Sequence, residues 1–551
     1  MKKIFLLFLL FISLFVNAQW TSNTAVNTEC FSGPTGDCLT AGTSKGGTYL
    51  AFFKQVSSPV NYEIHVQLID SNGVAQFAAD GIQASHINFS TFTQLFNCHV
   101  DANDNLIVAF NTSDAGNAVY VQKISSTGTL VWGNEVNVGN GFFAIPSTLT
   151  NGDVIVSWLD NATSKGQLMR LASTTGVPQW ASPTIITPVT ASDRTSAGHI
   201  VPISNSNFIV LFHDRVTSSL TSIFWAQRYD AIGNTVWASP VQLASVTTSY
   251  NRLYSPAANN DTVYLGYFGQ QGGLRFDSYL QRIDPDGTIP WGINGIDFST
   301  DATYYEQETK IAVSAATNCV WSACRYTNTG QGQSGIYVQK FNIVTGTRSL
   351  TDNAKLVYGV GSSADDYGMD GISIFGDNSP LLSFGLSSAT ATTESATKLD
   401  ASGNFVWAGN EIALGTFSAT KGRRALTYVV NNRATAVWVE NKGTEDRPYA
   451  QNIRSNGTTG PVVITGIDDL ITGNEPLKVF PNPAKNYFII SLTRVRTGDK
   501  IYLFNASGQL VQTENVISSN QMINVEKLPA GIYQLVFKTS NKQVVRSIKI
   551  N

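Results

Sequence analysis

Charged residues are scarce in this sequence. Asp, Glu, Lys and Arg make up only 14% of its 551 residues, and the formal net charge is -3. No long run of either sign occurs, so the composition indicates neither nucleic acid nor an anionic membrane surface as a partner. Outside the N-terminus there is no stretch of about 20 apolar residues, so no membrane span is expected in the mature chain.

Catalytic and metal-binding patterns are also absent from the sequence. There are only five histidines, and no HExxH, GxSxG or phosphate-binding loop motif occurs. The five cysteines do not have the spacing of a zinc site. We therefore assign no catalytic, metal-binding or cofactor-binding residue, and we expect no cofactor.

The N-terminus has the pattern of a secretory signal peptide. Two lysines precede an apolar run over residues 4–16, and small residues at Val16 and Ala18 predict cleavage after Ala18, which makes residues 1–18 the signal peptide. The alternative is a retained membrane anchor, but the run is short for a spanning helix and no basic cluster follows it.

Export permits disulfide bonds. Cys30 and Cys38 flank a Gly-Pro-Thr-Gly-Asp turn and are a candidate disulfide. Cys319 and Cys324 are five residues apart in an apparent strand, which points them to opposite faces. Because the count is odd, at least one thiol, with Cys98 as the fifth cysteine, is free or pairs outside the chain.

Polar turn residues and aromatics are abundant, and they occur in a repeat. A phrase with the form Gln-Lys/Arg, a turn, Gly and then a large apolar residue four positions later recurs about every 55 residues. Its large residues, which we call the blade anchors, are Trp20, Phe77, Trp132, Trp180, Trp237, Trp291, Leu350 and Trp407. Three or four short strands in each unit predict an all-β fold, a β-propeller most simply of eight blades over residues 19–466. Two sandwiches or an open solenoid are the alternatives.

Trp20 stands at the start of the mature chain without a preceding glycine of its own. It therefore resembles the anchor of a unit whose glycine, Gly457, lies at the other end of the repeat. Residues 461–465 resemble the short strands that follow other anchors. We expect the two ends to share one blade and so to close the ring, which removes exposed sheet edges.

The repeat resembles the tryptophan-docking motif of quinoprotein-type eight-bladed propellers. Residues 399–407, LDASGNFVW, are the closest copy. The resemblance covers only the positions at which blades pack, and this sequence has no adjacent Cys-Cys pair, so it implies the architecture and not the quinone chemistry.

A different pattern begins after an acidic stretch at residues 467–476, which we interpret as a linker. Residues 477–551 contain VFPNPAKN, then NASGQLV, then LPAGIYQLVF and a basic last strand. This order resembles the type A sorting domain of type IX secretion cargo in Bacteroidota, a small immunoglobulin-like β-sandwich. The alternative is an ordinary adhesion module. The motif positions are Pro481, Asn482, Pro483, Gly508, Leu528, Pro529, Gly531 and Tyr533.

The resemblance implies that the outer-membrane secretion machinery is a partner and that the mature protein is secreted or attached to the outer cell surface. For the propeller, the uniform units favour a binding or adhesion module for a glycan or a surface protein. The alternatives are a purely structural role and a polysaccharide hydrolase or lyase that uses acids on loops, such as Asp160, Asp214 and Glu306.

Three polar or aromatic groups remain as weaker candidates for a site. The triplet 213–215 (His-Asp-Arg) follows an apolar strand, and we interpret it as a solvated turn. Two acidic segments, at residues 101–105 and at Asp365, Asp366 and Asp370, have the composition of cation loops but not their full pattern. Aromatic pairs at 142–143, 304–305 and 89 with 92 would either stack on a ligand or pack beneath a neighbouring blade, and we favour packing.

Overall fold

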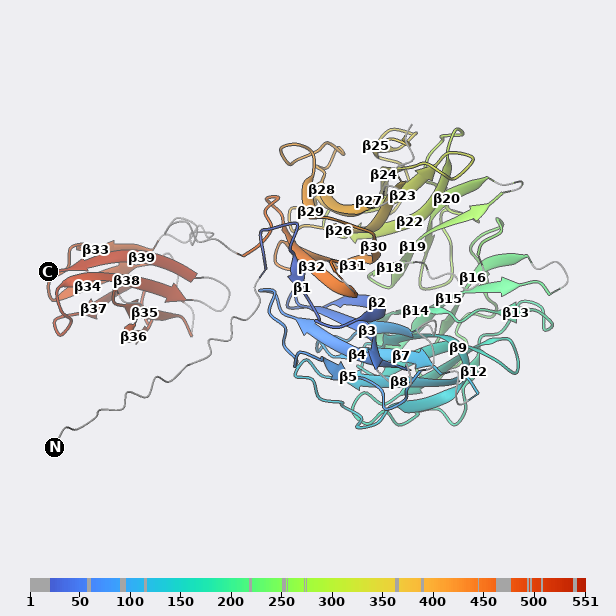
Figure 1. Cartoon of the computed structure of the whole chain (residues 1–551), viewed down its shortest axis with the longest axis horizontal. Helices are drawn as coiled ribbons and strands as arrows, with labels where there is room; N and C mark the ends of the chain where they lie inside the picture. Colours follow the sequence, from blue (N-terminus) through green and yellow to red (C-terminus); the bar gives the residue numbers. More distant parts are fainter. Residues whose placement is uncertain are drawn as a thin grey trace. The chain divides into compact units, whose positions relative to one another are not determined.

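The computed structural model describes residues 20–56, 61–89, 96–112, 116–217, 221–249, 254, 256–271, 273, 275–361, 366–387, 391–443, 445–461, 477–492, 495, 498–506, 509–538 and 543–551. The chain divides into two compact units, residues 1–461 and 462–551. Figure 1 shows their strands, labelled in chain order. The predicted signal peptide (1–18) and linker (467–476) lie outside the described residues.

The first unit contains antiparallel sheets whose four-stranded groups we call blades. The strands of the first blade are β2 (Thr35–Gly42), β3 (Thr48–Val56), β4 (Asn61–Ile69) and β5 (Ile82–Gln83). Those of the second are β6 (Phe96–Val100), β7 (Leu106–Asn111), β8 (Ala118–Ile124) and the first half of β9 (Val136–Thr148). The third has the second half of β9, then β10 (Val154–Asp160), β11 (Gly166–Leu171) and β12 (Thr184–Ile185). The fourth blade has five strands. In it, β13 (Arg194–Thr195) and β14 (His199–Pro202) both pair with β15 (Phe208–Arg215), and β16 (Ser222–Tyr229) and β17 (Val241–Gln242) follow. A short 3-10 turn, η1 (Ser204–Ser206), precedes β15.

The remaining four blades follow the same order. The fifth has β18 (Pro256–Asn259), β19 (Thr262–Gln270), β20 (Phe276–Ile283) and β21 (Ile296–Asp297). The sixth has β22 (Tyr305–Ser314), β23 (Cys319–Thr327), β24 (Ser334–Asn342) and β25 (Lys355–Tyr358). The seventh has β26 (Asp366–Ile374), β27 (Pro380–Ser387), β28 (Thr392–Lys398) and β29 (Ile412–Ala419). The eighth has β30 (Lys421–Leu426), β31 (Arg433–Asn441), β32 (Asp446–Arg454) and, from the other end of the chain, β1 (Thr28–Glu29).

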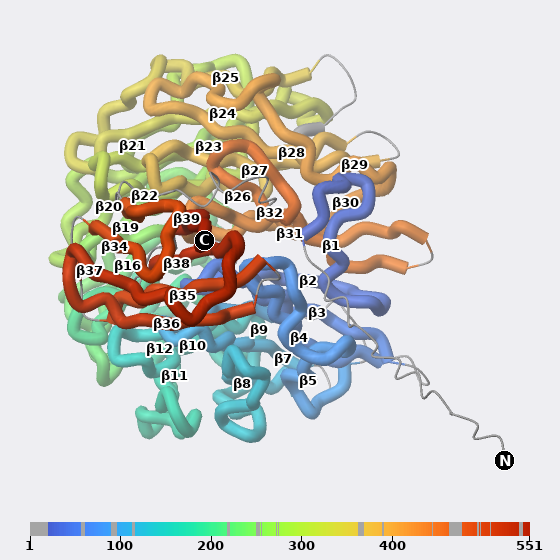
Figure 2. Tube along the Cα trace, turned by 90° about the vertical axis from the view of Figure 1, so that its left-hand side faces the viewer, coloured from blue at the N-terminus to red at the C-terminus, as the bar shows by residue number. Residues whose placement is uncertain are grey.

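These blades form a closed ring. The first strand of each contacts the first strand of the next, in the order β2, β6, β9, β14, β18, β22, β26, β30 and back to β2. The first strands therefore surround the axis, and the sequence-based prediction of an all-β propeller is confirmed. Figure 2 shows the blue N-terminal strand β1 beside the orange strands of the last blade, where it pairs with β32 through Thr28 and Glu29. The ends of the repeat thus share one blade, as expected, although the strand predicted at 461–465 lies almost wholly outside the described residues.

The most apolar strands occupy the second position of each blade. The apolar runs at 106–110 and 208–212, for example, form the second strands β7 and β15. Every residue of β7 is buried, because blades cover both of its faces and strands flank both of its edges. The innermost strand β6, which lines the axis, is mostly half-buried and more polar.

The recurring phrase is explained by contacts between blades. Each anchor lies against the glycine of the following blade, and the eight pairs are Trp20–Gly73, Phe77–Gly128, Trp132–Gly176, Trp180–Gly233, Trp237–Gly287, Trp291–Gly346, Leu350–Gly403 and Trp407–Gly457. These glycines all have positive φ, and a Cβ added at any of them would come within 3.4 Å of the anchor side chain. The indole N–H of each tryptophan anchor also donates to a turn carbonyl of that blade; Trp407 Nε1, for example, lies 3.1 Å from the Ser455 oxygen.

The Gln-Lys/Arg pair of the phrase has two separate roles. The glutamine amide donates to the connection within its own blade, as Gln281 Nε2 does to the Gly292 oxygen at 2.8 Å. The following base reaches the same turn of the next blade as the anchor does; Arg228 donates to the Pro285 oxygen at 2.8 Å. In the closing blade, Gln451 Nε2 donates to the Thr21 oxygen at 2.9 Å, which joins the two ends of the ring.

Cys30 and Cys38 lie at this closure, buried in one apolar cluster with Trp20. Both are free thiols in the structure, and burial raises the pKa of each. The disulfide stays a prediction. We expect the exported protein, unfolded without reductant, to titrate three thiols rather than five, because Cys98, Cys319 and Cys324 remain free.

Thiol labelling with mass mapping checks this prediction. Replacing both cysteines by serine should lower the free energy of unfolding by about 2–3 kcal/mol, the entropic effect of a loop of this length. Titration of all five thiols in the exported protein would show that no bridge forms.

The second unit is a two-layer sandwich. One sheet contains β33 (Lys478–Phe480), β34 (Tyr487–Ser491) and β37 (Asn520–Asn524), and the other contains β36 (Leu510–Asn515), β35 (Lys500–Phe504), β38 (Gly531–Lys538) and β39 (Gln543–Ile550). The inner faces of both sheets contribute to one core, in which Phe488, Leu503 and Leu535 are among the most buried side chains.

Candidate functional site

A cavity of about 550 Å³ lies where the first strands of the second to sixth blades face the axis of the ring. Its polar lining comes from Asn97, His99, Ser147, His199, Tyr254 and Lys310. Ile145, Pro146 and Val201 are among its apolar neighbours. None of the described residues that line this cavity, which we call the channel cavity, is Asp or Glu. The sequence analysis missed it because the first strands are short and irregular and carry no repeated phrase.

Hydrogen bonds between blades fix several of these side chains. Asn97 Nδ2 donates to the Ala144 oxygen at 2.7 Å, and His99 Nε2 lies 3.0 Å from the Thr148 hydroxyl. Burial lowers the pKa of His99 and lowers that of His199 to about 4. Both imidazoles are therefore neutral at pH 7, and each offers one donor and one acceptor nitrogen.

The triplet at 213–215 was interpreted as a solvated turn, and that interpretation was wrong. It ends β15, with His213 and Asp214 buried. The His213 ring packs 4.5 Å from Phe224 and 5.8 Å from Tyr254, which lines the channel cavity. Burial, followed by the neighbouring His199, lowers the pKa of His213 to about 3. His213 therefore supports the cavity wall as a neutral side chain.

The three acids considered for hydrolysis lie on different blades. Asp160 ends β10 and accepts hydrogen bonds from the backbone and hydroxyl of Thr163. Asp214 is buried and accepts the Val189 N–H at 2.6 Å, and burial raises its pKa. Glu306 is buried beneath the sixth blade. Within the described part of the chain, no hydrogen bond or ion pair joins any two of them.

Buried charges gather between the seventh and eighth blades. Arg424 Nε lies 3.2 Å from Asp370 and 3.6 Å from Glu394, and burial raises the pKa of both carboxyl groups. Its guanidinium fills the space left by Gly368 and Gly385, where a Cβ would overlap it. Asp370 and its partners thus join two blades rather than hold a cation; of the other acids of that segment, Asp365 lies outside the described residues.

A second buried ion pair continues this connection. Lys421 Nζ lies 2.8 Å from Glu440, with both side chains fully buried. The pair lies within the eighth blade, on β30 and β31, and Lys421 Nζ also donates to the Thr392 oxygen of the seventh blade at 2.6 Å. Breaking a buried pair of this kind leaves an uncompensated charge, so Lys421 and Glu440 have a structural role at this blade boundary.

The acidic segment at 101–105 is a turn between β6 and β7. The Asp101 carboxylate accepts the backbone N–H groups of Asn103 and Asn105 and lies 2.9 Å from Lys123 Nζ. Asp104 instead accepts the N–H of Ser44 in the first blade at 2.6 Å. Among the described residues there is no group of three or more His, Cys, Asp or Glu side chains that would hold a metal ion.

The aromatic pairs pack mainly within and between blades. Phe89 is fully buried against Phe53 and Phe110. Tyr304 packs on Tyr326, and Tyr305 packs on Phe276. Phe142 and Phe143 lie at an irregularity of β9, their ring centroids 6.4 Å apart and both half-buried. Phe89, Tyr304 and Tyr305 therefore have the expected packing role. Phe92 lies outside the described residues.

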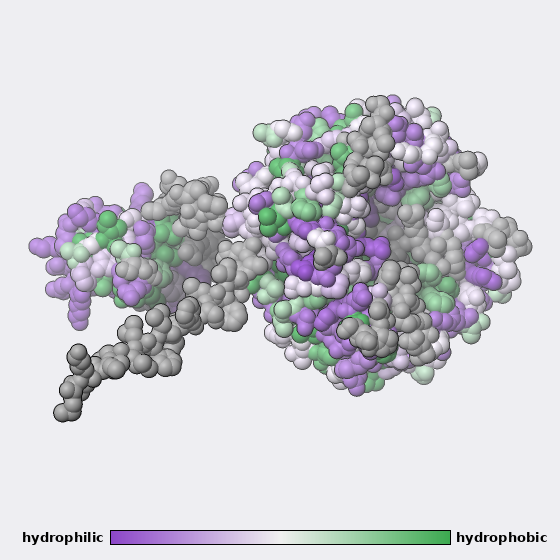
Figure 3. Space-filling view, in the orientation of Figure 1, coloured by the Kyte–Doolittle hydropathy of each residue, from purple (hydrophilic) through white to green (hydrophobic). Residues whose placement is uncertain are grey.

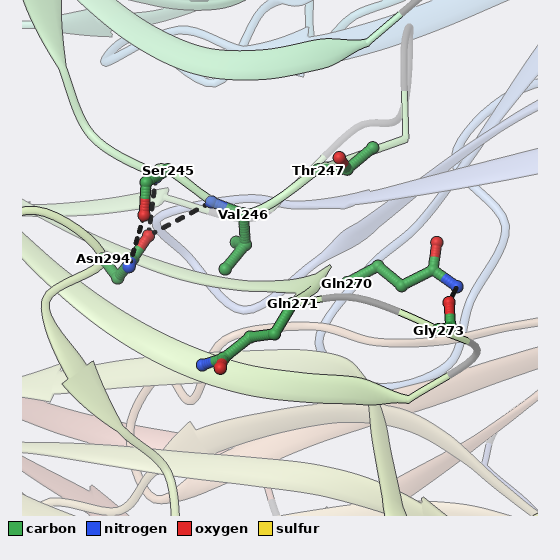
Figure 4. A pocket seen from close by; sticks show the side chains of 7 residues that line it. All are labelled: Ser245, Val246, Thr247, Gln270, Gln271, Gly273 and Asn294. Carbon is green, nitrogen blue, oxygen red and sulfur yellow. Dashed lines mark hydrogen bonds between the residues drawn. The ribbon is translucent and has the colours of Figure 1, made fainter.

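A second, smaller pocket of about 340 Å³ opens between the fourth and fifth blades, and Figure 4 shows it. Asn294 fixes its wall by accepting the Ser245 N–H at 2.7 Å and donating to the Ser245 hydroxyl at 2.9 Å. Gln270 and Gln271 extend from the opposite wall. The described lining contains amides and hydroxyls but no charged side chain.

The motif residues of the second unit fasten its last strand. Asn482 accepts the Lys549 N–H at 2.9 Å and donates to the Ser547 oxygen at 3.0 Å, between Pro481 and Pro483. Both prolines follow cis peptide bonds. Leu528 packs on the core of the sandwich, and the Tyr533 hydroxyl donates to the Pro529 oxygen. Gly531 is the first residue of β38. Gly508 lies outside the described residues.

Comparison with known families identifies this unit. Residues 478–551 match the family model described as the secretion system C-terminal sorting domain. The chain carries a type IX sorting domain. It is therefore an exported protein, secreted or attached to the outer cell surface, and its C-terminal unit interacts with the type IX secretion machinery. No helix among the described residues is long and apolar enough to cross a lipid bilayer.

One curated relative matches a short segment. It is β-agarase A of Zobellia galactanivorans, 34% identical over 55 residues, and the alignment spans 10% of each chain. The chain thus covers about a tenth of the length of that relative.

Similar solved structures include three with propeller or polysaccharide lyase titles. An ulvan lyase of polysaccharide lyase family PL25 is 10% identical over 66% of this chain and 93% of its own, with a TM-score of 0.43. The β-propeller domain of the Trilobed protease from Pyrococcus furiosus is 8% identical over 70% and 98%, with a TM-score of 0.39. The Dos1 propeller is 12% identical over 79% and 95%, with a TM-score of 0.41. Because these scores are below 0.5, the fold assignment rests on the closed strand order of this chain.

Proposed function

We propose that the exported propeller binds a carbohydrate in the channel cavity. The observation that carries the proposal is the chemistry of the lining, which has neutral hydrogen-bonding groups on several blades, the cation of Lys310, and no carboxylate among its described residues. Asn97, Ser147 and the two neutral imidazoles of His99 and His199 provide both donors and acceptors, which sugar hydroxyl groups require. Tyr254 adds an aromatic surface.

The size of the cavity also favours a carbohydrate over a folded protein. About 550 Å³ lies within the range of small-molecule pockets, whereas a stable protein interface needs a surface of about 1,000 Å² or more. The surface of the first unit in the view of Figure 3 shows small apolar patches separated by hydrophilic ones, without a broad apolar area.

Glycoside hydrolysis is less well supported. It generally requires two carboxyl groups about 5–9 Å apart on either side of the bond that breaks. The described lining of the channel cavity contains no such group, and Glu306 is hydrogen-bonded to Ser299 and Ser278 instead. A binding protein needs neither carboxylate, so the binding function is preferred.

Replacing Asn97 and His199 together by alanine is expected to weaken glycan binding at least about tenfold, since two half-buried hydrogen-bonding groups that line the cavity are lost. The ligand is first found by screening the full chain against an array of algal and plant oligosaccharides, and affinities are then measured by calorimetry.

The matched control is His86→Ala, which removes an exposed imidazole that contacts Glu135 on the propeller exterior. Binding that survives the double substitution, or is equally weakened by the control, would place the ligand elsewhere. Release of new reducing ends or unsaturated sugars by the full chain would show an enzyme instead.

A further inference from the structure

The two parts of the chain have opposite net charges, although the net charge of the whole chain is small. Residues 477–551 contain ten Lys and Arg but only three Asp and Glu, a formal charge of +7. Since the total is -3, the first 476 residues carry -10. The low charge density that excluded an anionic partner for the whole sequence therefore does not apply to the sorting domain.

Three of these cations lie on one sheet face of the sorting domain. Lys500 and Lys538 are directly opposite each other on β35 and β38, and Lys549 is opposite Ile532 on β39. All three lysines are exposed, and no ion pair holds any of them among the described residues. Like charges directly opposite in a sheet are only about 5 Å apart at Cβ and destabilise it. This arrangement is relieved when an anionic group binds between them.

The rest of this face combines apolar side chains with neutral polar ones such as Gln534 and Ser547. Alternation along the strands places Tyr502, Phe504 and Ile532 on the same side as the lysines, and Leu510 lies opposite Phe504. Leu510 and Ile532 are more than half exposed. Lys538 and Ile532 are six residues apart on β38, so Lys549, opposite Ile532, lies about 20 Å along the face from the Lys500–Lys538 pair. Tyr502 and Phe504 lie between them on β35. We call this surface the basic face.

We propose that the basic face docks on a membrane surface that carries anionic phosphate headgroups. Charge complementarity favours an anion, and the exposed apolar side chains between the lysines favour a lipid surface. A membrane presents phosphates beside an apolar layer, into which tips such as Ile532 and Leu510 insert while the lysines stay in the headgroup layer. An acidic protein surface would satisfy the lysines but not the apolar residues. The proposal does not depend on the glycan-binding function.

Flotation of the full chain with lipid vesicles tests this docking. The chain should bind vesicles of phosphatidylcholine with phosphatidylglycerol, bind vesicles of phosphatidylcholine alone far less, and be released by high salt. The triple variant K500Q/K538Q/K549Q should bind the anionic vesicles roughly 100-fold more weakly, since each lysine contributes about a factor of five.

The matched control is K478Q/K485Q/K527Q, which removes the same charge from other exposed positions of the same domain. It should lose much less affinity than the triple variant. Thermal unfolding shows whether the variants fold, and loss of the Lys500–Lys538 repulsion should leave the midpoint equal or higher. Equal loss in the control, equal binding to uncharged vesicles, or binding to polyglutamate without binding to vesicles would overturn the proposal.

Discussion

Replacing Trp20 by alanine is expected to lower the free energy of unfolding of the propeller by about 3–5 kcal/mol. Trp20 is 3% exposed, its ring lies on Gly73, and its indole N–H donates to the Ser71 oxygen at 2.9 Å. The same contact occurs in every blade, but here it also joins the N-terminal segment of the last blade to the first blade. Chemical denaturation followed by circular dichroism measures the change.

Two further variants separate packing from ring closure. Trp20→Phe keeps an aromatic ring but loses the hydrogen bond, worth about 1 kcal/mol, together with part of the buried indole, so it should cost more than the hydrogen bond alone and less than Trp20→Ala. Trp237→Ala removes an anchor inside the ring that is 8% exposed and also donates its indole N–H to the next blade, so it should cost a similar amount to Trp20→Ala. Only Trp20→Ala should make the segment before Cys30 sensitive to protease, because Trp20 joins that segment to the first blade through Gly73 and the Ser71 oxygen. Equal protease resistance of all three variants would show that Trp20 does not close the ring.

The propeller could be predicted from the sequence because its blade contacts repeat. The glycine with positive φ, the anchor four residues later and the Gln-Lys/Arg pair each form one contact that recurs in successive blades, as Gly457 with Trp407 illustrates. Such contacts link each blade to the next in the same way, so the residues that make them recur at a regular interval and leave a periodic pattern. The sorting domain was predictable for a similar reason, since Asn482 and its neighbouring prolines make specific contacts with the last strand.

The candidate site could not be predicted in the same way. The channel cavity collects short segments from five blades, such as those that contain Asn97, His199 and Lys310, and these segments are far apart in the sequence. Its shape depends on irregular first strands, which alternate poorly and include a residue with positive φ at Glu308. Buried acids such as Asp214 were taken for loop residues, because a polar triplet at the end of a strand does not reveal that another segment covers it.

Glu306 makes the free energy of unfolding of the propeller depend on pH. Burial raises the pKa of this carboxyl group from 4.5 to about 7, against hydrogen bonds from Ser299 and Ser278 that favour the charged form. The folded state therefore binds the proton more tightly than the unfolded state. Its contribution to stability is complete below about pH 4.5 and is lost as the pH rises through 7. The shift corresponds to about 3 kcal/mol.

Replacing Glu306 by glutamine is expected to remove that share of the pH dependence, because glutamine keeps the size of the side chain and a carbonyl acceptor but does not ionise. The measurement is the free energy of unfolding of both proteins from pH 4 to 8. Their difference should change by about 3 kcal/mol in favour of the variant as the pH rises. Glu306→Ala, which leaves a cavity, should instead lose stability at every pH. A difference between the native protein and the glutamine variant that is constant with pH would show that Glu306 ionises in the folded state as it does in the unfolded chain.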